Sequence, residues 1–172
     1  MEIFLIGLNH GYQLEGCMTH DWKTFDEYLF GFCKRAHIDL VAEELSEWAI
    51  KRNSHQGAIG SVGKNVASRL SIKHLFCDPD EVERKQLGIR NGKELSQSLG
   101  FGNILNAEQA TIVEQKEREQ WPIRERYWLE QLQKVHFRQC VFILGAQHVD
   151  SFDKLLARED FTVHIEHPDW EP

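Results

Sequence analysis

Five short apolar runs alternate with amphipathic stretches along the chain. The runs lie at residues 3–6, 38–42, 72–77, 140–144 and 161–165. Bounded apolar runs that are rich in β-branched and aromatic residues are typical of buried strands. The clearest helical spacing lies in residues 23–36, where the apolar positions are Phe25, Tyr28, Leu29, Phe32 and Cys33. This alternation predicts an α/β fold, with a mostly parallel or mixed central β-sheet flanked by helices.

The polar stretches between the other apolar runs predict helices at some positions and loops at others. Further helices are predicted at residues 44–52, 64–70, 81–89, 122–135 and 151–159. Asp80 is a candidate N-cap for the helix that starts at 81, and Asp150 or Ser151 for the last one. Residues 90–103 are polar and contain three glycines, which predicts a mobile loop or a lid. The polar stretch from 106 to Pro122 is assigned no helix, and the tail HPDWEP is predicted to be irregular.

Two of the predicted strands end in the same motif. Gly7-Leu8-Asn9-His10 follows one run, and Gly145-Ala146-Gln147-His148 follows another. Ligands of open α/β sheets bind at the carboxyl ends of the strands, where a glycine permits a sharp turn or close approach. Any one of the nine histidines taken alone would simply bond a neighbouring loop. The repeated motif predicts that His10 and His148 line one crevice at the carboxyl ends of the strands.

Carboxylates follow two more of the predicted strands. Glu43 and Glu44 come after the second strand and Asp78 after the third. Successive side chains of a strand point to opposite faces, so at most one of Glu43 and Glu44 is expected to face the crevice. A carboxylate beside histidines can ligate a divalent ion, orient an imidazole or act as a base, although acids are also favourable at helix starts without any function. The predicted metal-ligating set is His10, Glu43, Glu44 and His148, with Asp78 as a weaker candidate because Asp before Pro is common in turns.

Composition and missing motifs exclude several classes of protein. The chain of 172 residues has a formal net charge of -7, which argues against a nucleic-acid partner. No stretch reaches the about 20 apolar residues of a membrane span, and the first residues lack the basic and apolar regions of a secretory signal. The four cysteines are widely spaced, which favours a reducing, cytoplasmic location without disulfides. Nucleotide-binding, zincin and serine-hydrolase motifs are absent, and no linker divides the chain, so residues 1–172 are predicted to form a single domain.

The order of these features resembles a superfamily that groups TraB-type proteins, the Tiki metalloproteases, the erythromycin esterases and the ChaN haem-binding lipoproteins. The resemblance rests on Gly7-x-x-His10, Glu43-Glu44, Arg124-Glu125-x-x-Trp128 on a late helix, and Gly145-x-x-His148. In that superfamily, the paired histidines, the acidic residues and the arginine line one pocket at a sheet edge. The resemblance therefore implies that Arg124 joins the pocket, whereas composition alone places it in a solvated run of charge.

These features lead to a hydrolase as the first hypothesis. His10 and His148, helped by Glu43 or Glu44, would hold a divalent metal (manganese, cobalt, zinc or iron) or activate water directly, while Arg124 stabilises negative charge. The substrate would be a small molecule or a peptide with a peptide, ester or similar bond. The alternative is a non-catalytic sensor domain that binds haem, a metal or a small metabolite.

Overall fold

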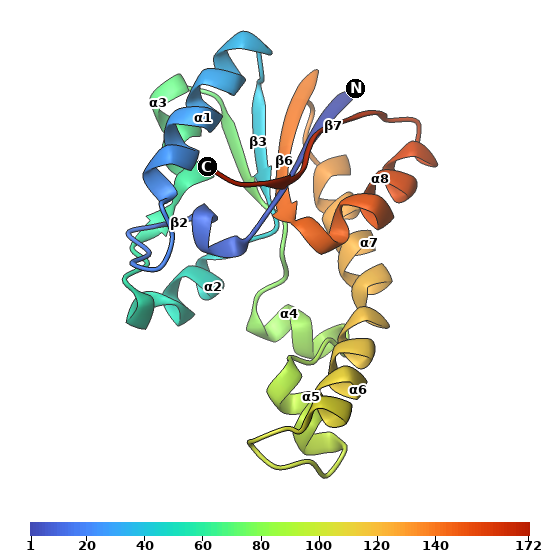
Figure 1. The fold of residues 1–172 in the computed structure, drawn as a ribbon. Helices are drawn as coiled ribbons and strands as arrows, with labels where there is room; N and C mark the ends of the chain where they lie inside the picture. The colour runs from blue at the N-terminus through green and yellow to red at the C-terminus, as the bar shows by residue number, and fades with distance from the viewer.

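Five parallel strands form the central sheet of the computed structural model, which describes residues 1–172 (Figure 1). The strand order is β5-β3-β6-β1-β7. The bounds are β1 Glu2–Leu8, β3 Leu40–Glu43, β5 Lys73–Phe76, β6 Gln139–Gly145 and β7 Thr162–Trp170. All four strand pairs are parallel. The predicted α/β fold, with its five strands, is therefore confirmed.

Helices cover both faces of the sheet. α1 (Trp22–Arg35) and α3 (Val62–Leu70) pack on one face, where they meet Ile6 and Leu8 of β1. α7 (Trp121–Gln133) and α8 (Val149–Ala157) pack on the other face, against Ile3 and Leu5. The central strands are thus buried on both sides, which explains why they read as continuous apolar runs.

Smaller elements lie near the carboxyl ends of the strands. β2 (Leu14–Glu15) and β4 (Gly60–Ser61) form a two-stranded antiparallel sheet, and α2 (Glu47–Arg52) follows β3. Short 3₁₀ turns cover His10–Gln13, Ser54–Gln56 and Ala146–His148. All four cysteines are buried and free. None of the helices combines the length and apolar content that a membrane crossing requires.

Three helices extend beyond the carboxyl edge of the sheet and form what we call the arm, residues 80–120 (Figure 1). They are α4 (Glu81–Gln86), α5 (Gly92–Ser98) and α6 (Ala107–Arg118). The predicted N-cap Asp80 begins α4. The prediction of a loop over 90–103 was wrong, as was the absence of a helix before Pro122. Reciprocal capping bonds of Asn91 with Glu94 and of Asn106 with Gln109 stabilise the starts of α5 and α6.

Two boundaries near the end of the chain also differ from the prediction. β7 continues through most of the tail that was expected to be irregular, because its backbone pairs with β1 and Trp170 is buried in the core. α8 begins at Val149, directly after His148, and has no side-chain cap. Ser151, a predicted cap, instead donates a hydrogen bond to Glu125.

Candidate active site

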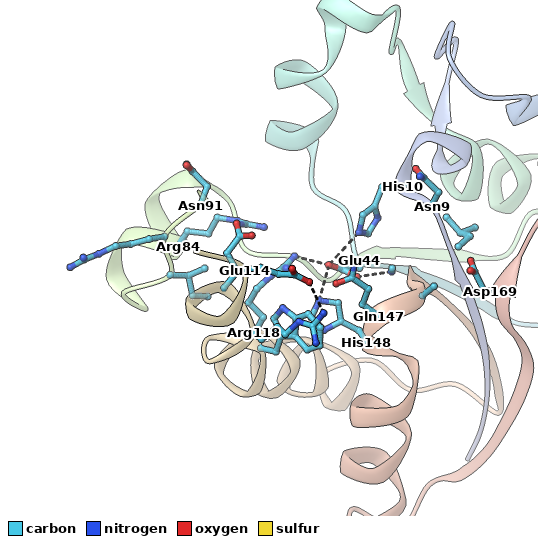
Figure 2. A pocket seen from close by; sticks show the side chains of 18 of the residues that line it. Asn9, His10, Glu44, Arg84, Asn91, Glu114, Arg118, Gln147, His148 and Asp169 are labelled. Carbon is cyan, nitrogen blue, oxygen red and sulfur yellow. Dashed lines mark hydrogen bonds and ion pairs between the residues drawn. The ribbon is translucent and has the colours of Figure 1, made fainter. Parts of the chain in front are cut away.

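The carboxyl edge of the sheet brings four of the predicted site residues together. His10, Glu44, Arg124 and His148 line a cleft of about 530 Å³, whose walls include residues of the arm (Figure 2). The two Gly-x-x-His motifs lie side by side because β1 and β6 are neighbours, with Leu8 paired to Gly145. The predicted common crevice of His10 and His148 is therefore present.

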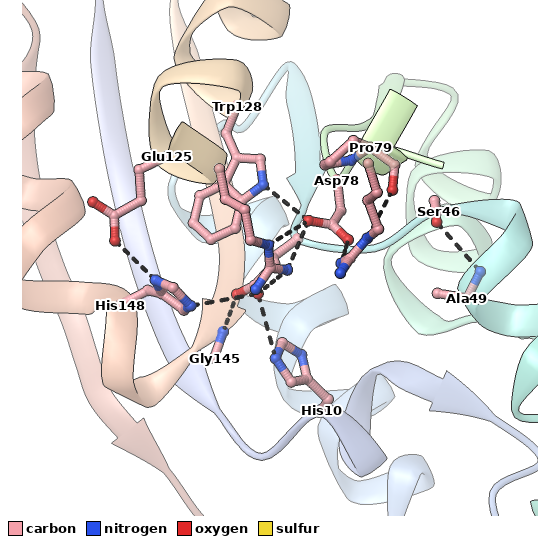
Figure 3. A network of polar contacts seen from close by, with 12 residues as sticks. His10, Ser46, Ala49, Asp78, Pro79, Glu125, Trp128, Gly145 and His148 are labelled. Atoms are coloured by element: carbon pink, nitrogen blue, oxygen red, sulfur yellow. Dashed lines mark hydrogen bonds and ion pairs between the residues drawn. The ribbon is translucent and has the colours of Figure 1, made fainter. Parts of the chain in front are cut away.

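Glu44 interacts with the other three residues of this group, and dashed lines in Figure 3 run from the labelled His10, His148 and Gly145 to its carboxylate. Its side chain is only 1% exposed. Oε1 accepts a hydrogen bond of 2.7 Å from Arg124 Nη2, and Oε2 accepts one of 2.8 Å from the backbone N–H of Gly145. The Nε2 atoms of His10 and His148 lie 3.6 Å and 3.8 Å from Oε1. One carboxylate thus meets a guanidinium and both imidazoles.

Each imidazole is anchored through its other nitrogen. His10 Nδ1 lies 2.6 Å from the amide oxygen of Gln13, and His148 Nδ1 lies 2.8 Å from the carboxylate of Glu125. Because an amide oxygen and an ionised carboxylate only accept hydrogen bonds, each Nδ1 carries the proton in these contacts. In the neutral form of each ring, Nε2 therefore carries the lone pair, and it faces Glu44 and the cleft in a fixed orientation.

Arg124 is held in place by a second carboxylate. Its Nε and Nη2 donate to Asp78 Oδ1 at 3.2 Å and 2.7 Å. Asp78 also accepts hydrogen bonds from Trp128 Nε1 at 3.1 Å and from Arg84 of the arm. These contacts leave Nη1 of Arg124 without a partner inside the protein. Arg124 can therefore offer a fixed donor to a ligand in the cleft.

The charges of this network keep its members ionised. Burial alone would raise the pKa of Glu44, but the positive charges of His10 and His148 in their protonated forms, together with that of Arg124, outweigh it and hold that pKa below its usual value. The pKa of Asp78 is lowered in the same way, since Arg124 and Arg84 outweigh its burial. Burial opposes the charge of Arg124, yet Glu44 and Asp78 raise its pKa above the usual value. At neutral pH the buried network therefore consists of charged and mutually compensating groups.

Glu43, also a predicted site residue, does not reach the cleft. It points to the opposite face of β3, where it is fully buried and accepts hydrogen bonds from Ser61 and, at 2.7 Å, from His74 Nε2. Its Oε2 has no hydrogen-bond partner. The placement of Glu43 in the site was wrong, and the alternation of strand side chains explains why only one of the two acids faces the cleft.

Three further residues of the site escaped the sequence reasoning. Gln13 and Glu125 anchor the histidines, and Trp121 packs against His148 with ring centroids 4.4 Å apart. Trp121 also lines the cleft. Glu125 could have been predicted as a site residue because it directly follows Arg124 in the motif. For Gln13, the only indication in the sequence was its position three residues after His10.

The two motif glycines prevent different collisions. A Cβ on Gly7 would lie 2.2 Å from the backbone oxygen of Pro168 and 2.5 Å from Val149 Cγ2. A Cβ on Gly145 would lie 2.8 Å from His10 Nε2 and 3.4 Å from Glu44 Oε2. Gly7 therefore allows β7 and α8 to pack, whereas Gly145 leaves room for the imidazole of His10.

Alanine substitutions should separate these two roles. Gly7→Ala is expected to lower the free energy of unfolding by about 1–3 kcal/mol, because backbone atoms must move. Gly145→Ala is expected to be less destabilising, because the exposed side chain of His10 can swing away, and to impair the chemistry of the site instead. Urea denaturation of both variants tests this prediction. Equal losses of stability would contradict it.

The predicted metal position lies between the two imidazoles and Glu44. A metal at the predicted position would need His10 Nε2, His148 Nε2 and Glu44. Both oxygens of Glu44 already accept hydrogen bonds, and the guanidinium of Arg124 lies 2.7 Å from Oε1. A second cation would be repelled there. No group of three or more His, Cys, Asp or Glu side chains is arranged to hold a metal ion. The donor set therefore fits a divalent metal poorly.

Comparisons with protein-family models, curated proteins and solved structures found no match.

Proposed function

We propose that the protein is a hydrolase that adds water to the carbonyl group of an ester or amide bond. The observation that carries this proposal is the pair of anchored imidazoles, whose Nε2 atoms lie 3.6 Å and 3.8 Å from the same oxygen of Glu44. Oriented imidazoles beside a carboxylate are suited to general acid–base catalysis. The order of motifs further supports membership of the superfamily of TraB-type proteins and erythromycin esterases.

In the proposed mechanism, His10 is the general base. Its side chain is 49% exposed, so water and substrate can reach Nε2. His10 Nε2 takes one proton from the water as the water oxygen bonds to the carbonyl carbon. His148 Nε2 accepts the other hydrogen of the water and orients it. Glu44 stabilises the imidazolium that forms on His10, and Gln13 accepts from its Nδ1 throughout.

Arg124 and His10 complete the reaction. The electron pair of the carbonyl bond moves to the oxygen, where Nη1 of Arg124 stabilises the negative charge. When the carbonyl re-forms, the bond to the leaving oxygen or nitrogen breaks, and the leaving group takes the proton from His10. The products are a carboxylic acid and an alcohol or amine, and His10 returns to its neutral form.

The test is a hydrolysis assay on protein dialysed against EDTA. Its substrates are 4-nitrophenyl esters and amino-acid 4-nitroanilides, and elemental analysis accompanies it. Saturable turnover that survives EDTA, with no stoichiometric metal, is expected. Stoichiometric manganese, cobalt, zinc or iron that is lost in the folded double variant His10→Ala/His148→Ala would replace this mechanism by a metal-dependent one. Absence of turnover on every substrate would contradict the hydrolase proposal and favour a sensor that binds haem, a metal or a metabolite.

A further inference from the structure

The side chains that line the cleft include more unpaired negative charges than unpaired positive ones. Three of its arginines form ion pairs within the protein: Arg124 with Glu44 and Asp78, Arg84 with Asp78, and Arg118 with Glu114. These cations are largely compensated before any substrate enters. The remaining arginine of the lining, Arg90, is exposed and forms no ion pair.

The uncompensated charges of the cleft are mostly negative. Glu117, Asp169 and Glu171 line the cleft, and none of them forms an ion pair. Three carboxylates therefore stand against the single guanidinium of Arg90. The whole chain also carries a formal net charge of -7, so its long-range field attracts cations.

Two of these carboxylates line the same cleft as the catalytic histidines, at the β7 end of the sheet edge. Trp170 of β7 pairs with Leu8 of β1 and is buried, whereas its neighbours Asp169 and Glu171 are exposed to the cleft. The adjacent strands β6, β1 and β7 thus deliver His148, His10 and the two acids in that order along the sheet edge. In Figure 2, Asp169 lies beyond His10 and Asn9, on the side away from Arg118 and the arm.

The buried part of the cleft independently indicates a ligand. His148 is 6% exposed and its Nε2 points to the cleft, yet no hydrogen bond within the protein uses that atom. Few lining residues are apolar, Leu8, Ile89, Trp121 and Ala146 among them. A ligand that pairs with the polar groups of the cleft must itself be hydrophilic, because an apolar ligand would leave those groups without hydrogen-bond partners.

We infer that the substrate is a hydrophilic ester or amide that carries an ammonium group, which lies against Asp169 and Glu171 while the scissile carbonyl lies beside His10. This inference rests on the proposed function for the reaction, but the charge preference concerns binding alone. Exposed ion pairs are worth up to about 1 kcal/mol, so the preference should be about fivefold and should weaken as salt screens it.

Three 4-nitrophenyl esters of similar length test the preference: those of 6-aminohexanoate, hexanoate and adipate, which carry a positive, neutral and negative end. We expect kcat/KM to fall in that order, with the cationic ester about fivefold above the neutral one. The double variant Asp169→Asn/Glu171→Gln should remove this advantage through a higher KM. Glu27→Gln/Glu130→Gln, which removes two exposed acids outside the cleft, should retain it.

Binding separates this inference from the proposed function. The His10→Ala variant lacks the proposed base, so its affinity for hexylammonium and for 1-hexanol can be measured by calorimetry without turnover. Tighter binding of hexylammonium that depends on Asp169 and Glu171 supports the inference even if wild type hydrolyses none of the esters. Equal affinities, or a preference for the adipate ester in the assay, would overturn it while leaving hydrolysis itself intact.

Discussion

The Glu44→Gln variant is expected to hydrolyse substrate about a thousandfold more slowly than the wild-type protein. Glutamine removes the charge that faces His10, Arg124 and His148. The imidazolium that forms on His10 then loses its stabilising partner. The amide nitrogen would also face either Arg124 Nη2 or the N–H of Gly145, both of which are donors. Measured kcat and KM should show the loss mainly in kcat.

Glu43→Gln is the matched control. Glu43 is the preceding residue, is equally buried and points to the other face, where a glutamine oxygen can still accept from Ser61 and His74. Its kcat should remain close to the wild-type value. Similar losses of activity in both variants, with unchanged circular dichroism, would mean that Glu44 acts through the integrity of β3 and not through its charge.

Asp78→Ala is expected to lower the free energy of unfolding by about 3–5 kcal/mol, because it leaves buried cations without their partner. The side chain of Asp78 is 4% exposed and that of Arg124 is 16% exposed. Arg84 and the indole N–H of Trp128 would lose the same acceptor. Urea denaturation at neutral pH measures the effect.

An exposed ion pair provides the comparison. Arg69 Nη1 lies 2.7 Å and 2.6 Å from the two carboxylate oxygens of Asp26, but Arg69 is 42% exposed. Asp26→Ala should therefore cost less than about 1 kcal/mol. If the two substitutions had equal effects, burial would not be what makes the Asp78 contacts important.

The contribution of Asp78 to the free energy of unfolding should also depend on pH. The pKa of Asp78 is lowered in the folded protein from an ordinary value of 3.8, because Arg124 and Arg84 outweigh its burial. A carboxylate of this kind contributes its full stability above the unfolded pKa, and the contribution is lost as pH falls through the lower folded pKa. The stability difference between wild type and Asp78→Asn should therefore be constant near neutral pH and narrow below about pH 4. A difference that grows on acidification would contradict the charged state of Asp78.

Local patterns sufficed for much of the framework. The five apolar runs marked all five strands of the central sheet, and the spacing of residues 23–36 marked α1. The arm was harder to predict. Its helices α5 and α6 carry few apolar residues, and their starts depend on reciprocal caps at Asn91 and Asn106. Such a polar helix leaves no amphipathic pattern to detect.

The sequence by itself determined the strands, the repeated glycine–histidine motifs and the rule that only one of Glu43 and Glu44 could face the crevice. These features follow from local periodicity and from the alternation of strand side chains. Only the tertiary structure decided that Glu44 is the inward acid and that Gln13 and Glu125 anchor the histidines. It also decided that β7 extends to Trp170, so that Asp169 and Glu171 line the same cleft as His10. Those outcomes depend on strand order and on contacts between residues distant in the chain, such as Glu44 with Arg124, and no local pattern encodes which distant partner a side chain will meet.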